Sequence, residues 1–244
     1  MILILGGTHE AHLLAQELQA KDLNFIVSLA GVTRNPPPRD YPTRSGGFGG
    51  AKGLAGYLTA KNITALIDMT HPYAAKISTS AVWACAQTGI PLIRYDRPAW
   101  IAPKDADWRA VATHSDGAGA LPSGARAFLT VGSGGLAPFA GRGDVWFLYR
   151  AIEKPAVAFA RGTEVLQRPP FSLEDELALM AHHKITHLVT KNAGGTKTFA
   201  KIKAATRLAI PIIVVERPDL PVIEVATSIP DVLKWLRNPG KRIL

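Results

Sequence analysis

An internal repeat is the feature that most limits how this chain can fold. The segment 62–70 resembles the segment 184–192, with Ile63 aligned to Ile185 at an offset of 122 residues. A second pair of segments, 89–98 and 209–218, shares an Ile-Pro step and an Arg-Pro step at an offset of 120 residues. Because such self-similarity indicates a copied structural unit, we expect two halves with the same fold.

Within each half, short apolar runs alternate with glycine turns and helical stretches. Short apolar runs bounded by turns are typical of parallel strands that are buried on both faces. Their alternation with helices implies a parallel sheet with right-handed crossovers. We therefore expect an α/β protein of two similar doubly wound, Rossmann-like domains. The expected strands are 2–5, 25–29, 65–69, 92–95, 127–131, 145–148, 187–190 and 212–215, and the expected helices are 10–20, 52–61, 76–87, 172–182 and 231–237.

The tract 98–124 is rich in Pro, Gly, Asp and Ser, so we expect the halves to join there. We place an N-terminal domain at 1–110 and a C-terminal domain at 111–244, with a cofactor in the cleft between them. The only cysteine, Cys85, cannot form an internal disulfide, and its small-residue surroundings predict a buried apolar role. No Cys/His cluster suggests a metal, so no metal site is expected.

Composition excludes several classes of protein. No signal-peptide pattern precedes the run at Ile2, and no apolar run reaches the roughly 18 residues that a membrane span needs. We therefore expect a cytoplasmic protein with no membrane partner. The net charge is +9, but the Lys and Arg residues are scattered and no stacking-aromatic RNA-binding pattern is present. The charge suits a small polyanionic ligand better than nucleic acid.

The turn Gly6-Gly7-Thr8 follows the first strand and opens a helix. In open parallel sheets, ligands bind at the carboxyl ends of the strands near the point where the strand order reverses. Glycines there let the backbone approach a pyrophosphate, and a helix N-terminus attracts negative charge. The full G-x-G-x-x-G pattern is absent, and a plain tight turn is the alternative. His9 and His12 are expected to face solvent or pack on the helix.

The end of the second strand predicts which dinucleotide binds. NAD-preferring folds place an acidic residue here to hold the ribose 2′-hydroxyl. No acid lies between Phe25 and Arg39, and Ser28, Thr33 and Arg34 stand there instead. Because an Arg fork suits a phosphate, this set favours NADP over NAD.

The third strand is followed by Thr70-His71-Pro72-Tyr73, and its duplicate by Thr190-Lys191-Asn192-Ala193-Gly194-Gly195. We expect Pro72 in the first turn of the next helix. By position, the candidate catalytic residues are His71, Tyr73 and Lys191, with solvent as an alternative proton source. The expected cofactor-binding residues are Gly6, Gly7, Thr8, Ser28, Gly31, Thr33, Arg34, Thr70, Gly132, Ser133, Asn192 and Gly194.

With these motifs in view, the chain resembles the precorrin-6A reductase family of cobalamin biosynthesis. The resemblance follows the family order through almost the whole chain. It rests on Leu5-Gly-Gly-Thr-x-Glu-Ala11, Thr70-His-Pro-Tyr-Ala74, Gly89-Ile-Pro91 with Arg97-Pro98, Leu129-Thr-Val-Gly-Ser133, Pro170-Phe-Ser172, Val189-Thr-Lys-Asn-Ala-Gly194, and Lys203-Ala-Ala205 with Ile210-Pro211 and Arg217-Pro218.

The resemblance implies an oxidoreductase acting on a CH–CH group. NADPH would deliver a hydride to one double bond of the precorrin-6A macrocycle, and a proton would be added at the neighbouring carbon to give precorrin-6B. The substrate is a polycarboxylate tetrapyrrole, which gives the positive charge a purpose. Arg39, Arg44 and Lys191 are expected to bind its carboxylates, and the working expectation for the oligomeric state is a monomer.

Three alternatives stay open at this point. One is an NAD(P)-dependent epimerase or dehydratase, which should carry a Tyr-x-x-x-Lys pair, although Tyr73 is followed at that spacing by Ile77. Another is a non-catalytic regulator that binds NADPH without consuming it. The third is a nucleic-acid binder, which would show steep salt dependence towards DNA.

Overall fold

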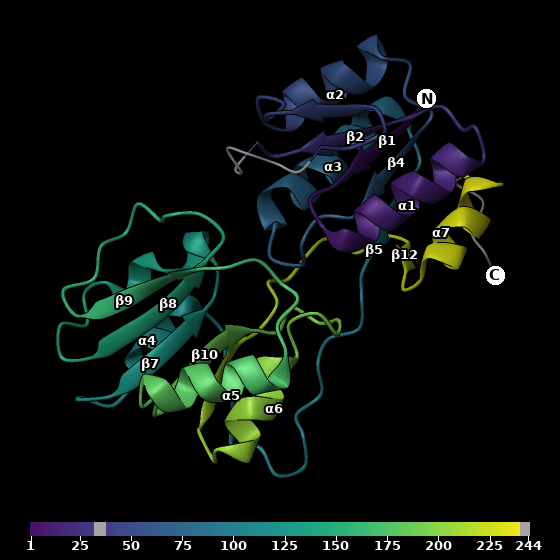
Figure 1. Cartoon of the computed structure of the whole chain (residues 1–244). Helices are drawn as coiled ribbons and strands as arrows, with labels where there is room; N and C mark the ends of the chain where they lie inside the picture. Colours follow the sequence, from purple (N-terminus) through teal and green to yellow (C-terminus); the bar gives the residue numbers. More distant parts are fainter. Residues whose placement is uncertain (32–37, 240–244) are drawn as a thin grey trace. The chain divides into compact units, whose positions relative to one another are not determined.

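The structure, a computed structural model, describes residues 1–31 and 38–239. The chain divides into two compact units, each built around its own six-stranded sheet (Figure 1). Unit 1 comprises Met1–Pro98 and Pro218–Leu244, and unit 2 comprises Ala99–Arg217. The expectation of an α/β protein with two doubly wound parallel-sheet domains is confirmed.

The sheet of unit 1 has the strand order β12-β5-β4-β1-β2-β3, and every neighbouring pair is parallel. Because β1 lies between β2 and β4, the strand order reverses at β1. Helices α1 and α7 cover one face of the sheet, and α2 and α3 cover the other. The strands are β1 (Ile2–Leu5), β2 (Phe25–Leu29), β3 (Thr43–Ser45), β4 (Ala65–Asp68), β5 (Leu92–Tyr95) and β12 (Val225–Ala226), and the helices are α1 (His9–Ala20), α2 (Gly50–Ala60), α3 (Ala75–Thr88) and α7 (Ile229–Leu236).

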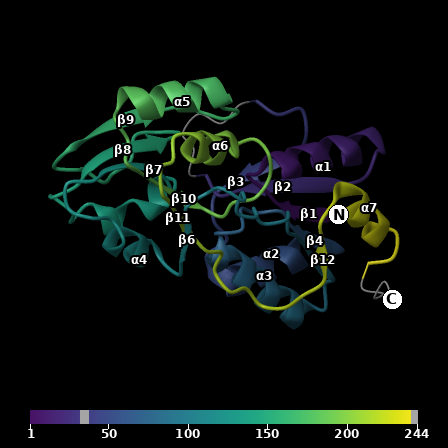
Figure 2. The same ribbon diagram turned by 90° about the horizontal axis from the view of Figure 1, so that it is seen from below.

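The sheet of unit 2 has the order β6-β11-β10-β7-β8-β9, again all parallel. Helices α5 and α6 pack on one face, and α4 packs on the other beside two short 3-10 turns (Figure 2). The elements are β6 (Trp108–Val111), α4 (His114–Gly119), β7 (Arg126–Thr130), the 3-10 turns Ser133–Gly135 and Ala137–Phe139, β8 (Trp146–Ala151), β9 (Gly162–Leu166), α5 (Leu173–His182), β10 (His187–Lys191), α6 (Ala200–Arg207) and β11 (Ile212–Val215).

The two strand orders are equivalent, with β6 in the place that β12 takes in unit 1. Strand β6 follows β5 along the chain but completes the sheet of unit 2, and β12 follows β11 but completes the sheet of unit 1. The chain leaves one unit for the other at Arg97-Pro98 and again at Arg217-Pro218. The repeated Arg-Pro step of the sequence therefore marks the two crossovers.

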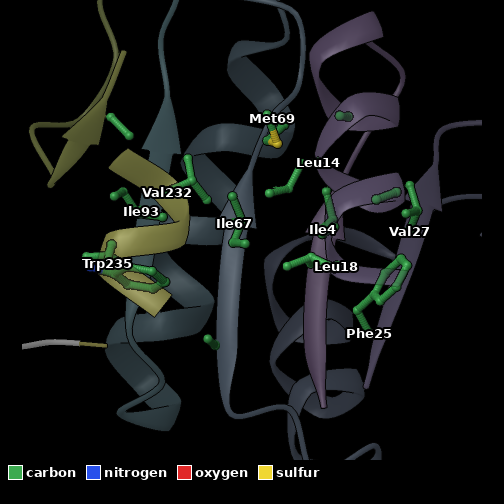
Figure 3. Close-up of a cluster of buried hydrophobic side chains, with 14 of the residues drawn as sticks. Ile4, Leu14, Leu18, Phe25, Val27, Ile67, Met69, Ile93, Val232 and Trp235 are labelled. Carbon is green, nitrogen blue, oxygen red and sulfur yellow. The ribbon is translucent and has the colours of Figure 1, made fainter. Parts of the chain in front are cut away.

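Because of this exchange, the observed division of the chain differs from the expected division between residues 110 and 111. The first crossover comes at residues 98 and 99, and the C-terminal segment returns to unit 1. The reason is physical: β12 pairs with β5, and Val232 and Trp235 of α7 are buried with Ile67 and Ile93 in the first core (Figure 3).

Most interior elements lie where the sequence predicts them, within a few residues. Ser172 accepts a hydrogen bond from the Asp175 N–H at 3.0 Å, so the predicted helix start of α5 is confirmed. Cys85 is buried, and burial raises the pKa of its thiol to about 12. Among the helices and strands, those without an expected range are α4, α6 and the strands β3, β6, β9 and β12. These strands lie at or beside sheet edges and are partly exposed, so they lack the continuous apolar runs of inner strands.

In the described parts of the chain, no helix is long and apolar enough to cross a membrane. The same residues hold no group of three or more His, Cys, Asp or Glu side chains placed to bind a metal ion.

Trp235→Ala should lower the free energy of unfolding by about 3–5 kcal/mol, because it removes a large buried side chain. Trp235 is 1% exposed, and its indole N–H donates to Glu224 Oε2 at 2.8 Å. Urea unfolding followed by circular dichroism measures the change. The control is Val222→Ala, since Val222 is 99% exposed and its loss should alter stability by less than about 0.5 kcal/mol. Equal effects of the two substitutions would show that α7 does not contribute to the first core.

Candidate functional site

The turn after β1 has the geometry of a phosphate-binding turn. A Cβ on Gly6 would lie 2.7 Å from Val27 Cγ1, so only glycine fits against β2. Gly7 has a φ of +111°, a conformation that side chains disfavour. Thr8 is the N-cap of α1 and accepts a hydrogen bond from the Ala11 N–H at 3.1 Å. The turn therefore brings bare backbone to a helix N-terminus beside the point where the strand order reverses.

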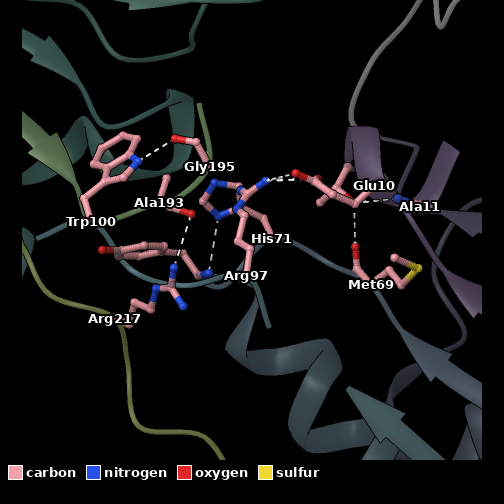
Figure 4. Close-up of polar contacts among 11 residues, drawn as sticks. Glu10, Ala11, Met69, His71, Arg97, Trp100, Ala193, Gly195 and Arg217 are labelled. Atoms are coloured by element: carbon pink, nitrogen blue, oxygen red, sulfur yellow. Dashed lines mark hydrogen bonds and ion pairs between the residues drawn. The ribbon is translucent and has the colours of Figure 1, made fainter. Parts of the chain in front are cut away.

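The loops after β1 and β4 are joined directly. Thr8 Oγ1 donates to the Met69 carbonyl at 2.8 Å (Figure 4). Because a hydroxyl has a single proton, this bond occupies the hydroxyl donor of Thr8, which was expected to bind cofactor. Thr8 thus shapes the turn, and the backbone around Gly6 and Gly7 is left as the surface that a phosphate could approach.

Residues 71–74 form a turn ahead of α3. The Ala74 N–H donates to the His71 carbonyl at 2.7 Å, and Pro72 takes the second position of the turn, which suits its fixed φ. The expectation that Pro72 lies in the first helical turn is wrong, since α3 begins at Ala75. The Tyr73 N–H donates to His71 Nδ1 at 3.3 Å, so the neutral imidazole carries its proton on Nε2.

The end of β2 carries a cation held against a hydroxyl. Arg44, opposite Ser28 in the register of β2 and β3, donates from Nη1 to Ser28 Oγ at 2.6 Å. Its guanidinium lies 4.1 Å from the centre of the Phe48 ring and 5.2 Å from that of Tyr57. Gly31 has a φ of +74°, and a Cβ there would meet Ser45 Oγ at 3.0 Å. Arg44, expected to bind substrate, therefore stands at the predicted cofactor site.

Arg39 belongs to a neighbouring cluster, which contacts α1 at His12. It donates from Nη1 to the Tyr41 hydroxyl, which lies 3.0 Å from His12 Nδ1. His12 thus packs within the fold, as expected, and His9 is exposed. Thr33 and Arg34, two predicted cofactor ligands, lie outside the described residues.

The sequence analysis missed an ion pair beside the glycine turn. Arg97 Nη1 lies 3.1 and 3.0 Å from the two carboxylate oxygens of Glu10, in the first turn of α1 (Figure 4). A carboxylate at this helix end would repel a phosphate, and the guanidinium offsets its charge. Burial raises the pKa of the nearby Tyr95, and the negative charge of Glu10 adds to the increase. The Arg-Pro repeat was the available signal for Arg97.

In unit 2 the equivalent turn differs. Gly132 has a φ of +74°, and the Lys191 Nζ lies 3.5 Å from the position that a Gly132 Cβ would take. Ser133 begins a three-residue 3-10 turn where unit 1 has the twelve-residue α1. Burial lowers the pKa of His114, and the positive charge of Lys191 lowers it further. Unit 2 therefore holds a lysine beside its glycines but lacks a helix N-terminus comparable to that of α1.

The polar groups of the loop after β10 are hydrogen-bonded to other residues of unit 2. Asn192 Oδ1 accepts from the Trp100 N–H at 2.8 Å, and Asn192 Nδ2 donates to the Trp100 carbonyl at 3.3 Å. The Trp100 indole N–H donates to the Gly195 carbonyl at 2.6 Å, while Arg217 donates to the Asn192 and Ala193 carbonyls (Figure 4). Gly194 is left-handed in this loop. Asn192, expected to bind cofactor, thus has both ends of its amide bonded to Trp100.

A buried cation lies behind this loop. Lys201, in the first turn of α6, is 5% exposed, and its ammonium lies 5.0 Å from the centre of the Trp100 ring. Burial lowers its pKa to about 7, and the positive charges of Arg150 and Lys191 act in the same direction against Glu176. Arg150 and Glu176 form a two-bond ion pair of 2.7 and 3.0 Å, so Glu176 does not depend on Lys201 for a partner.

Known proteins resemble this chain in sequence and in fold. Residues 1–237 match the family described as precorrin-6x reductase CbiJ/CobK. The chain is 43% identical to precorrin-6A reductase of Rhodococcus erythropolis, over 99% of both chains. It is 38% identical to precorrin-6A reductase of Rhodobacter capsulatus, over 98% of this chain and 96% of the relative. A solved CobK precorrin-6A reductase superimposes with a TM-score of 0.93 at 38% identity, covering 98% of this chain and 96% of the other.

Lys201→Met should flatten the pH dependence of stability. The native pKa of about 7 lies below the ordinary 10.5, so between these values the unfolded chain binds the extra proton. The unfolding free energy contributed by this group therefore rises with pH across that window. Urea unfolding from pH 6 to 9.5 should show this rise in the parent protein and lose it in the variant. The control is Lys203→Met, at an exposed position of the same helix, which should keep the rise. A rise that persists in Lys201→Met would exclude Lys201 as its source.

Proposed function

The chain belongs to the precorrin-6x reductase family of cobalamin biosynthesis and is an oxidoreductase of that pathway, and we propose that it reduces precorrin-6A with NADPH held by unit 1. A nicotinamide cofactor supplies a hydride to one ring double bond, and a proton is added at the neighbouring carbon. The dihydro product is precorrin-6B. The observation that carries the cofactor assignment is the turn from β1 into α1 at the point where the strand order reverses.

Only unit 1 fits a dinucleotide in this way. Its turn presents Gly6 and Gly7 at the N-terminus of α1, with the Glu10 carboxylate offset by Arg97. In the duplicate, the short 3-10 turn at Ser133–Gly135 offers a much smaller dipole. The cofactor-binding roles predicted for Gly132, Ser133, Asn192 and Gly194 therefore have less support than those predicted for Gly6 and Gly7.

The end of β2 favours the phosphorylated cofactor. The dinucleotide rule places the adenosine ribose at this strand end, where an acid selects the 2′-hydroxyl of NAD. This chain has Ser28 in its place, bonded to the cation of Arg44. A guanidinium and a hydroxyl are donors that suit a 2′-phosphate. We therefore assign Arg44 to the cofactor, together with Ser28 and the predicted Thr33 and Arg34.

The substrate is a tetrapyrrole with many carboxylates, and the net charge of +9 suits such a polyanion. Arg39 and Lys191 remain the proposed carboxylate ligands. Both relatives are named for precorrin-6A without cobalt, which supports a metal-free macrocycle. A cytoplasmic monomer fits this role.

The loop after β4 is the proposed place of proton transfer. The hydrogen bond from the Tyr73 N–H orients the imidazole of His71 and keeps the proton of the neutral ring on Nε2. To act as the acid, the ring must first take a second proton from solvent, and the resulting imidazolium then passes one proton to the carbon and returns to the neutral form. The Tyr73 phenol and the Lys191 ammonium are the other side-chain candidates, and solvent is the remaining source.

Tryptophan fluorescence titration should show tight binding of NADPH and binding of NADH that is at least about tenfold weaker, a difference of about 1.4 kcal/mol. Arg44→Gln should weaken NADPH by about tenfold and leave NADH nearly unchanged, because only NADPH carries the 2′-phosphate. Arg109→Gln is the control, since Arg109 is an exposed residue of β6 in unit 2. An equal loss of affinity for NADPH and NADH would show that Arg44 does not recognise the 2′-phosphate. Binding of neither cofactor by the parent protein would contradict the proposed function.

Replacement of the three candidate acids separates their roles. His71→Gln, Tyr73→Phe and Lys191→Met should each be assayed for single-turnover oxidation of NADPH by precorrin-6A and for NADPH affinity. Replacement of the true proton donor should lower the rate of the chemical step by about 100-fold or more with little change in cofactor affinity. Near-normal turnover in all three variants would assign the proton to solvent. NADPH binding without turnover in the parent protein would indicate a regulator instead of an enzyme.

A further inference from the structure

A buried ion pair lies at the carboxyl end of the unit 1 sheet. Asp68 ends β4 and is 1% exposed, and Arg94 of β5 is 8% exposed. The two residues are opposite each other in the register of β4 and β5. Arg94 Nε lies 3.6 Å from Asp68 Oδ2, and neither atom has a hydrogen-bond partner among the described residues. Burial of charges with incomplete hydrogen bonding opposes folding, so packing alone does not explain the pair.

The duplicated half shows that the fold does not need these charges. The register pair Thr190 and Val214 of β10 and β11 occupies the equivalent place in unit 2, at the repeat offsets of 122 and 120 residues. Thr190 is 1% exposed and Val214 is 0% exposed, so both environments are buried. The same strand ends therefore form with an uncharged pair, and the ion pair is particular to the unit with the glycine turn and α1.

The pair is connected to the loop that carries His71. Asp68 Oδ1 accepts two hydrogen bonds from Thr70, from the N–H at 3.1 Å and from the hydroxyl at 2.7 Å. The Thr70 hydroxyl also lies 3.4 Å from Ser78 Oγ on α3. On the other side, Arg94 Nη1 donates to the Pro221 carbonyl at 3.2 Å, in the segment that returns to unit 1. The carboxylate thus sets the backbone direction at Thr70, and Arg94 holds the carboxylate.

We propose that Asp68 and Arg94 are positioning residues for the reduction, which fix the Thr70–Tyr73 loop against the glycine turn. This inference rests on the proposed function, because the loop is assigned there to proton transfer. Asp68 orients the backbone of Thr70 through two hydrogen bonds. The orientation of Thr70 in turn determines where the turn formed by residues 71–74 begins. Arg94 neutralises the carboxylate and keeps it in place.

The test transfers the uncharged pair of unit 2 into unit 1, as the double variant Asp68→Thr, Arg94→Val. Removal of both charges avoids leaving one of them buried and unpaired, which would be strongly destabilising. The variant should fold with a circular dichroism spectrum and Tm close to the parent. Its kcat should fall by at least about tenfold, while the Kd for NADPH, set by contacts at β1 and β2, should change by less than about threefold.

Amide hydrogen exchange gives a readout that does not depend on activity. The peptide covering Thr70–Ala74 should exchange faster in the double variant, because the Thr70 N–H loses its acceptor. The conservative double variant Asp68→Asn, Arg94→Gln keeps an oxygen acceptor at position 68 and leaves no charge buried and unpaired, so it should retain kcat within about threefold with a protected Thr70 amide.

Each outcome decides the proposal. A double variant that fails to fold would show that the pair is a fold element, and one that turns over at the parent rate would show that the pair positions nothing. Loss of kcat and of Thr70 protection in the Asp68→Asn, Arg94→Gln variant would overturn the role of the Oδ1 acceptor. If the parent protein binds no NADPH, the proposed function fails, while the exchange experiment still tests the loop geometry.

Discussion

Two backbone ladders, between β5 and β12 and between β11 and β6, determine how this chain is divided. A parallel sheet leaves unpaired N–H and C=O groups at its edges and needs both faces covered. Each half meets this need with a strand and a helix from beyond a crossover: β12 with α7 in unit 1, and β6 with α4 in unit 2. The Arg97-Pro98 and Arg217-Pro218 steps stand where the chain leaves each half. The integrity of unit 1, and of the cofactor site proposed within it, therefore depends on the segment that returns after the second crossover.

The two halves share a strand order but have diverged where ligands bind. Unit 1 keeps a long helix after its glycine turn, an ion pair between Glu10 and Arg97, and the charged register pair of Asp68 and Arg94. Unit 2 has a short 3-10 turn, and its loop after β10 is held by Trp100 and Arg217. A duplicated fold thus provides its own comparison, since a feature found in one copy alone is not required by the strand order that the copies share. This comparison supports the proposal that the cofactor binds to unit 1.

Much of the fold could be predicted because inner strands are buried on both faces and read as apolar runs, as β1, β4 and β11 do. The exchange of edge strands could not be predicted, since β12 has two residues and its partner is decided by tertiary packing. The glycine turn and the His71 loop were found from their motifs. The contacts of Arg44, Asp68 and Asn192 could not be predicted, because the pairing of segments that are separated in the sequence decides them. Arg44, for example, meets Ser28 only through the pairing of β2 with β3.

The proposed function requires that the dinucleotide binds to the turn between β1 and α1 and not to its duplicate. Amide hydrogen exchange of the full chain, with and without saturating NADPH, tests this most directly. We expect slower exchange in the peptide covering Gly6–Ala11 on addition of NADPH, and no comparable change in the peptide covering Gly132–Leu136. Protection of Gly132–Leu136 with unchanged exchange at Gly6–Ala11 would contradict it and move the cofactor to unit 2.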